Sequence, residues 1–157
     1  MMTPPKKKKK ERLPVIGWRE WVSLPELGIE KIRAKIDTGA ATSAMHISHF
    51  RMLKSKKKGV EFRIHPVQHK SRPAIVARAT LVEHRQVRSS VGHLTERPVI
   101  KTLLKIGEDK WPIELTLVNR DIMSFRMLIG REAIRKRYLV NPARSHLASK
   151  RNKTSII

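Results

Sequence analysis

The sequence predicts a single all-β domain with one short helix near its C-terminus. The length of 157 residues suits one domain. Along much of the chain, apolar residues alternate with polar ones at a period of two. That period places one row of side chains in a core and the other in solvent. Prolines fall between the alternating segments, where strands end. Short strands at this spacing are typical of a barrel or a sandwich.

The elements follow one another from Val15 onward. The runs that predict strands, by alternation or by β-branched and leucine-rich composition, are 32–36, 60–64, 75–82, 99–106 and 113–117. Residues 107–110 lie between two such runs, begin with Gly107, and predict a hairpin loop. The segment 131–138, which follows Gly130, is the one that predicts a helix. Residues 83–95 contain the turn formers Ser89, Ser90 and Gly92, and predict a flap-like hairpin.

Three segments divide the chain by composition. Residues 1–13 carry the run Lys6–Lys10 and predict a disordered basic arm, since blocks of like charge repel one another and stay solvated. Residues 14–147 form the predicted domain. Residues 148–157 predict a flexible basic tail.

The charge is strongly positive, with 35 Lys and Arg against 13 Asp and Glu, which gives 35 − 13 = +22. Such an excess attracts polyanions: RNA, DNA, anionic membrane or acidic polypeptide. A solubilising surface explains the same charge equally well. Aromatic residues make up only 4% of the chain, which disfavours the base-stacking mode of single-strand binding. Non-specific attraction to phosphate stays open.

Several classes of protein are disfavoured by composition. There are no cysteines, which excludes disulfides, zinc ribbons and cysteine nucleophiles. The longest apolar stretches are too short to span a membrane. The apolar stretch after the lysine run is also too short for the core of a signal peptide. We therefore expect a cytoplasmic protein without a membrane association.

The most informative motif is Ile36-Asp37-Thr38-Gly39-Ala40. An alternating strand runs into Asp37, and Gly39 permits a turn that a Cβ would oppose. The Thr38 hydroxyl can bind neighbouring backbone and fix the loop. By itself, this pattern is also that of an ordinary Asx turn. A second motif near the C-terminus, Met127-Leu128-Ile129-Gly130-Arg131, is an apolar strand followed at once by the predicted helix.

Together the two motifs resemble the lobe of a retropepsin-type aspartic protease. Further segments extend the likeness to a particular family: 16–22, 24–28, 34–40, 96–100, 111–117, 119–121 and 125–131. These resemble the retropepsin-like proteins that are called ATP-dependent zinc proteases and occur alongside RimK-type ATP-grasp glutamate ligases, the RimB-like proteins. The likeness covers about residues 15–147. It implies an all-β, closed retropepsin-like barrel lobe with one short C-terminal helix.

The resemblance implies an aspartic-type endopeptidase, a hydrolase whose catalytic motif is Asp37, Thr38 and Gly39. One lobe supplies one catalytic Asp, and general acid–base activation of water needs two carboxylates. Asp109 and Asp121 lack the Asp-Thr-Gly setting. The sequence therefore predicts a homodimer with two-fold symmetry, in which each copy contributes Asp37 and Thr38 braces the pair. Ala40, His46, His93 and Arg131 are the predicted substrate-binding residues.

Neither zinc nor ATP is supported by the residues themselves. The seven glycines are scattered and form no phosphate loop, so an ATP requirement fits a partner ligase better. The seven histidines form no His-Glu-x-x-His motif. We therefore predict no cofactor and no metal ligands. A role of His46 or His93 in binding a metal, in moving a proton or in ordinary hydrogen bonding is left open.

The substrate prediction combines the charge with the resemblance. A basic dimer attracts acidic peptides, and the association with glutamate ligases suggests polypeptides that carry glutamate tails.

The sequence departs from the family pattern at Ala41, where a basic residue is usual, and residues 41–43 carry no carboxylate to pair with Arg131. The alternative is a non-catalytic basic module that binds RNA, the ribosome or an ATP-grasp ligase.

Overall fold

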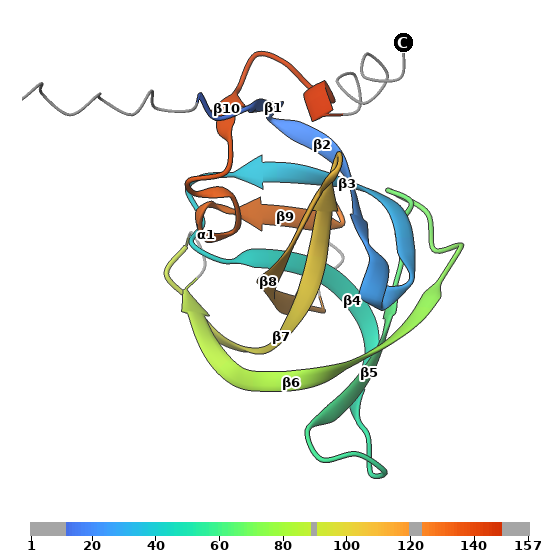
Figure 1. Ribbon diagram of the computed structural model, residues 1–157. Coiled ribbons are helices and arrows are strands. Elements are labelled where there is room, and N and C mark those ends of the chain that lie inside the picture. Colours follow the sequence, from blue (N-terminus) through green and yellow to red (C-terminus); the bar gives the residue numbers. More distant parts are fainter. Residues whose placement is uncertain (1–11, 89–90, 120–123, 149–157) are drawn as a thin grey trace, which may run out of the picture.

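A closed β-sheet forms most of the molecule (Figure 1). The computed structural model describes residues 12–88, 91–119 and 124–148. The strands are β1 (Val15–Gly17), β2 (Arg19–Leu24), β3 (Ile29–Asp37), β4 (Ser43–Met52), β5 (Gly59–Ile64), β6 (Ile75–Arg88), β7 (Leu94–Ile106), β8 (Asp109–Val118), β9 (Met127–Gly130) and β10 (Leu139–Asn141). The 3-10 helix η1 (Pro25–Leu27) and the α-helix α1 (Arg131–Ile134) lie between these strands.

The main sheet has eight strands in the order β2-β3-β9-β4-β5-β6-β7-β8. Two additional pairings, β2 with β7 and β4 with β8, close this sheet on itself. Closure removes most free strand edges, which is how a barrel protects its backbone groups. The predicted all-β, closed barrel is therefore confirmed. β1 and β10 form a separate parallel pair that joins the two ends of the domain.

The position of β9 in the sheet determines how the turn after Asp37 is held. β9 lies between β3 and β4, parallel to β3 and antiparallel to β4. Its last residue, Gly130, is the Cα partner of Asp37. Figure 1 shows the arrowheads of β3 and β9 ending together, next to α1. The turn after Asp37 is thus held by a strand that comes about 90 residues later in the chain.

The core is built by the alternation that the sequence shows. In β3, Ile32 and Ala34 are fully buried, whereas Lys35 between the core positions is exposed. Phe62 in β5 is the largest fully buried side chain, and it belongs to the same apolar cluster. Burial of a side chain of this size stabilises the fold by about 1.5–3 kcal/mol. The predicted strands at 32–36, 60–64, 75–82, 99–106 and 113–117 are all present, within longer strands.

Two local predictions need correction in their bounds. The helix predicted over 131–138 ends at Ile134, because Lys136 has a φ of 66° and the Arg137 N–H binds the Ile134 carbonyl oxygen in a turn. Tyr138 then packs against Trp111, with 5.8 Å between the ring centroids, and donates its hydroxyl to Asp109 Oδ2 at 2.5 Å. The loop predicted over 107–110 shrinks to residues 107–108, since Ile106 already pairs with Asp109.

The C-terminal side of the domain is anchored by a buried carboxylate. Glu20 in β2 is fully buried and accepts backbone N–H groups from Gly17, Leu147 and Ala148 at 2.8, 2.8 and 2.9 Å. Ala148 is 4% exposed, one residue past the predicted boundary of the domain. The predicted basic arm, with Lys6–Lys10, and residues 149–157 of the predicted tail lie outside the described residues, apart from 12–13. In the described ranges, no helix is long and apolar enough to cross a membrane.

Candidate active site

Asp37 is the last residue of β3, half-buried, at the point where the chain turns. The Gly39 N–H donates to Asp37 Oδ1 at 3.1 Å, and the Ala40 N–H donates to the Asp37 carbonyl oxygen at 3.2 Å. Thr38 and Gly39 are exposed, and Ala40 is half-buried. A Cβ on residue 39 would stand 3.3 Å from Asp37 Oδ1. The turn therefore fixes one carboxylate oxygen and leaves the tip of the loop at the surface.

Gly130 packs closely against the backbone of the residues that follow the Asp37 turn. A Cβ on this residue would lie 2.6 Å from the carbonyl carbon of Thr42, so only glycine permits the approach. The Gly130 N–H donates to Ser43 Oγ at 3.1 Å. Thr116 in β8 donates its hydroxyl to the Ser43 carbonyl oxygen at 2.9 Å. Ser43 is 2% exposed, and its hydroxyl thus connects the turn to β9.

Arg131 holds the same turn from the start of α1. Its backbone N–H donates to the Ala40 carbonyl oxygen at 2.9 Å, and the Glu132 N–H donates to the Ala41 carbonyl oxygen at 3.1 Å. Its Nη1 donates to the Gly39 carbonyl oxygen at 3.2 Å and lies 3.5 Å from that of Thr38. Backbone carbonyls thus receive the guanidinium, which explains how the turn is held although residues 41–43 carry no carboxylate.

The predicted substrate-binding residues fall into separate regions. Ala40 and Arg131 adjoin Asp37, as described above. His46 is 2% exposed in β4, and its backbone N–H binds the Arg126 carbonyl oxygen, at the start of β9 rather than at Gly130. That position is about four residues, or roughly 13 Å of strand, from the level of Asp37. His93 is exposed in the connection between β6 and β7. Within one copy of the chain, His46 therefore lies along β4 from the Asp37 turn, and the role of both histidines in substrate binding stays a prediction.

A hairpin does form over the predicted flap segment. β6 and β7 pair from Arg88 with Leu94 through Leu81 with Ile100. Figure 1 places the connection between them at the same edge of the view as the arrowhead of β3. The tip residues 89–90 lie outside the described residues. That this hairpin closes over Asp37 stays a prediction.

The stem of this hairpin borders a cleft that residues following the Asp37 turn also line. The cleft has a volume of about 520 Å³, and Thr42, Ser43 and Arg85 are among the residues that line it. Arg85 in β6 forms ion pairs with Glu114 at 2.7 Å and Glu83 at 2.6 Å. Hydrogen bonds to Glu114 and then to Glu83 raise the pKa of Arg85 above its usual range. The cation is thereby fixed between β6 and β8, next to the residues that follow Asp37.

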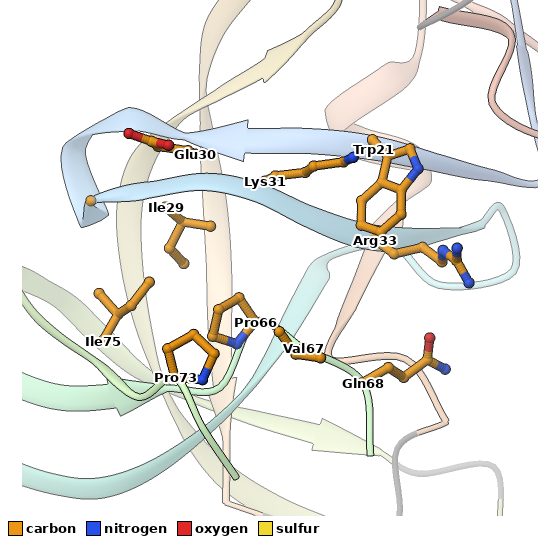
Figure 2. Close-up of a pocket in the computed structure, with 11 residues that line it drawn as sticks. Trp21, Ile29, Glu30, Lys31, Arg33, Pro66, Val67, Gln68, Pro73 and Ile75 are labelled. Carbon is orange, nitrogen blue, oxygen red and sulfur yellow. The ribbon is translucent and has the colours of Figure 1, made fainter. Parts of the chain in front are cut away.

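A row of cations shares the outward face of β3 with Asp37. Arg33 and Lys35 alternate with buried core residues, as Asp37 does, so their side chains leave the same face of the strand. Figure 2 shows Arg33 and Lys31 beside Trp21 of β2, with Lys31 Nζ 4.2 Å and Arg33 Cζ 4.7 Å from the ring centroid. Beside them lies a groove of about 640 Å³. Its opposite side is mostly apolar and includes Pro66, Val67, Pro73 and Ile75, with Gln68 beside Val67.

Possible metal ligands are not clustered in the part of the chain that the structure describes. Across 12–88, 91–119 and 124–148, no group of three or more His, Asp or Glu side chains is placed to hold a metal ion.

Sequence reasoning missed three residues around the site: Ser43, Lys35 and Arg85. The signal for Lys35 was present, since it stands two residues before Asp37 in an alternating strand. Ser43 and Arg85 carry no local signal, because their role depends on β9 and β8, which are distant in sequence.

Comparison with known proteins places the chain in a family. The family model for the RimB-like, retropepsin-like aspartic endopeptidase RimB matches residues 15–151. Proteins named "Probable alpha-L-glutamate ligase" are similar to this chain. The protein of Parasynechococcus marenigrum is 43% identical over 84% of this chain and 28% of its own length. That of Shewanella halifaxensis is 36% identical over 90% of this chain and 31% of its own length. The chain thus spans less than a third of these relatives.

A solved structure supports the fold. A Legionella pneumophila protein of unknown function superposes with a TM-score of 0.72, at 22% identity, over 86% of this chain and 98% of that one. At this identity the likeness concerns the fold alone. The family model, however, spans nearly the whole domain, including the Asp37 turn and the Gly130–Arg131 junction that holds it. The chain belongs to the RimB-like family of retropepsin-like aspartic endopeptidases.

Proposed function

We propose that this protein is an aspartic-type endopeptidase that hydrolyses acidic polypeptides, with Asp37 as the catalytic residue. The observation that carries the proposal is the position of Asp37. Its carboxylate stands at the end of β3, with one oxygen bound by the Gly39 N–H and the turn held by Arg131 and Gly130. A rigid, half-exposed carboxylate is suited to act on a water molecule.

The second carboxylate comes from a second copy of the chain. Two Asp37 side chains meet at a two-fold axis and share one proton, because two like charges a few ångströms apart cannot both ionise cheaply. The charged carboxylate takes a proton from the water that lies between them. The protonated one donates to the carbonyl oxygen of the scissile bond as the tetrahedral species forms. Thr38, exposed beside Asp37, braces the pair across the axis.

The cations of β3 support an acidic substrate. Side chains on one face of an extended strand recur about every 7 Å, both in β3 and in a bound extended peptide. Lys35 and Arg33 therefore match the spacing of alternate carboxylates in a glutamate-rich segment that enters at Asp37. The net charge of +22 adds a field that draws such a segment to the site. Lysine–carboxylate attraction at exposed positions is screened by salt.

The test compares cleavage of a glutamate-tailed peptide with that of a neutral peptide of equal length, followed by mass spectrometry. Asp37→Asn keeps an oxygen for the Gly39 N–H, so it should fold but lose cleavage. Glu108→Gln, the same chemical change at an exposed turn residue, should cleave like the wild type. Lys35→Gln should raise the KM for the acidic peptide only. Cleavage by Asp37→Asn, or by an enzyme that sedimentation shows to be monomeric, contradicts the proposal.

A second candidate function is a non-catalytic module that binds a glutamate ligase, RNA or the ribosome. One observation favours it: the relatives that match this chain over less than a third of their length are named as ligases. In this case Asp37→Asn leaves the function intact. Purified protein that fails to cleave either peptide, yet co-elutes with an ATP-grasp ligase at physiological salt, would favour this candidate.

A further inference from the structure

A second cluster of reactive side chains lies away from the Asp37 turn. It surrounds a cavity of about 290 Å³ whose lining includes Ser48, His65, His69, Lys70 and Arg126. Ser48 stands in β4, five residues after Ser43, which adjoins Gly130. This separation is roughly 16 Å of strand, so the cavity is distinct from the Asp37 site. His46, a predicted substrate-binding residue, also lines this cavity, but the peptidase proposed above does not use Ser48 or His65.

The hydrogen bonds in this cluster fix a direction for the protons. His65 Nδ1 lies 2.8 Å from the Ser71 carbonyl oxygen, and His65 Nε2 lies 2.7 Å from Ser48 Oγ. A carbonyl oxygen can only accept, so Nδ1 carries the proton. In the neutral ring, Nε2 is then the acceptor, and the Ser48 hydroxyl donates to it. A hydroxyl, a base that takes its proton, and a third group that orients the base form the arrangement of an activated nucleophile.

The backbone around Ser48 is adapted to present this hydroxyl. The pairing of β4 with β5 shifts register between Ser48 and Arg51, and His49 within the shift has a φ of 53°. A left-handed backbone at a residue other than glycine is strained, and such strain collects at functional sites. Bulges in strands re-aim side chains in the same way. His49 Nδ1 thereby reaches Ser48 Oγ at 2.9 Å.

The side chains of Ser48 and His65 are accessible from a cavity that positively charged residues also line. Ser48 and His65 are half-buried and both line the cavity. Lys70 and Arg126 line it too and make its potential positive. A volume of about 290 Å³ is at the lower end of ligand pockets, which restricts the occupant to a small molecule.

We propose that Ser48 is a nucleophile, with His65 as its general base, and that it hydrolyses esters of small anionic acids. Ser48 Oγ attacks the carbonyl carbon of the ester while its proton moves to His65 Nε2. The alkoxide leaves with that proton, which gives an alcohol and an acyl-serine. Water then attacks the acyl-serine, gives its proton to His65, and releases the acid as serine is restored. The Ser71 carbonyl keeps the imidazole oriented throughout, and the cations attract the acid portion.

The experiment uses the full chain and a small fluorophosphonate, diisopropyl fluorophosphate, with the modified peptide located by mass spectrometry. We expect a single adduct, on Ser48. Turnover, measured as the rate above the enzyme-free hydrolysis of each ester, is followed with the mono-p-nitrophenyl ester of succinic acid, for which we expect a larger enzymatic rate than for p-nitrophenyl acetate. Loss of a general base typically slows such a step by about 10²–10⁴-fold, so His65→Gln should slow both the labelling and the turnover by that range.

His84→Gln is the matched control, because it makes the same chemical change at an exposed histidine of β6 that does not line this cavity. It should label at the wild-type rate. The adduct on the wild-type protein needs no variant, so misfolding of His65→Gln leaves the test intact. Labelling spread over exposed serines, no labelling at all, or an unchanged rate in a folded His65→Gln would overturn the proposal.

Discussion

The buried carboxylate of Glu20 offers the sharpest test of how the domain is held together. Replacing Glu20 by Gln changes one oxygen into an amide nitrogen and nothing in the shape. Oε2 accepts the N–H groups of Gly17 and Leu147, and Oε1 accepts that of Ala148. Whichever way the amide turns, its NH₂ group faces at least one N–H donor. At least one hydrogen bond is therefore lost, and a donor is left without an acceptor.

The expected cost follows from these three bonds. A hydrogen bond to a charged group contributes about 1.5–3 kcal/mol, so Glu20→Gln should lower the free energy of unfolding by about 2–3 kcal/mol. Glu20→Ala leaves three N–H groups unsatisfied at about 1–3 kcal/mol each, or roughly 3–9 kcal/mol together. Domains of this size have a total stability of about 5–15 kcal/mol. The alanine variant should thus be close to unfolded.

Urea unfolding at neutral pH, followed by tryptophan fluorescence, measures both variants. Glu26→Gln is the matched control, because exposed Glu26 accepts one N–H, from Leu103 at 2.9 Å, and the amide oxygen can replace it. The control should stay within about 0.5 kcal/mol of the wild type. If Glu20→Gln were equally close, the buried carboxylate would not be holding residues 147–148 against β2, and the reasoning would fail.

Three further predictions concern the site and the surface. Gly130→Ala should destabilise by about 1–3 kcal/mol, because the new Cβ meets the Thr42 carbonyl carbon; an unchanged thermal midpoint would refute this. Arg131→Lys should cost about 0.5–1.5 kcal/mol in urea unfolding, since lysine lacks the planar Nη1 group that donates to the turn carbonyls, and no loss would contradict that contact. Hydrogen bonds from Arg78 and Arg51 lower the pKa of Glu61. Its stabilisation is therefore complete above the unfolded-state pKa and is lost as pH falls through the folded one. Glu61→Gln should be less stable than the wild type near pH 7 and equal to it in acid; a gap that persists in acid would refute the pairing.

The parts of this fold that depend on local pattern could be predicted from the sequence. Alternation alone identified the strands around Ile32, Phe62 and Leu115, because burial of one face imposes a period of two. The Asp37 turn was identified for the same reason, since a strand ends there and Gly39 follows. The helix after Gly130 was predicted too long, because the packing of Tyr138 on Trp111 outweighs helical propensity.

What could not be predicted depends on contacts between distant residues. The hold of β9 on Asp37 joins residues about 90 positions apart, which no local pattern records. The hydrogen bond of Ser48 to His65 depends on the register of β4 against β5 and on the bulge at His49. The distance of His46 from the Asp37 turn depends on how far β4 extends, and its role at the site stays a prediction.

The late position of β9 in the chain has a consequence for biosynthesis. β3 and β4 leave the ribosome early, yet the strand that separates them is among the last to be made. Strand pairings between residues this far apart in sequence form slowly, because the entropy of closing a long loop is lost before the contacts that stabilise the pairing can form. A polypeptide that lacks β9 therefore contains the Asp-Thr-Gly sequence without the strand that holds Asp37 in position. The molecule acquires its reactive geometry only when synthesis of the domain is nearly finished.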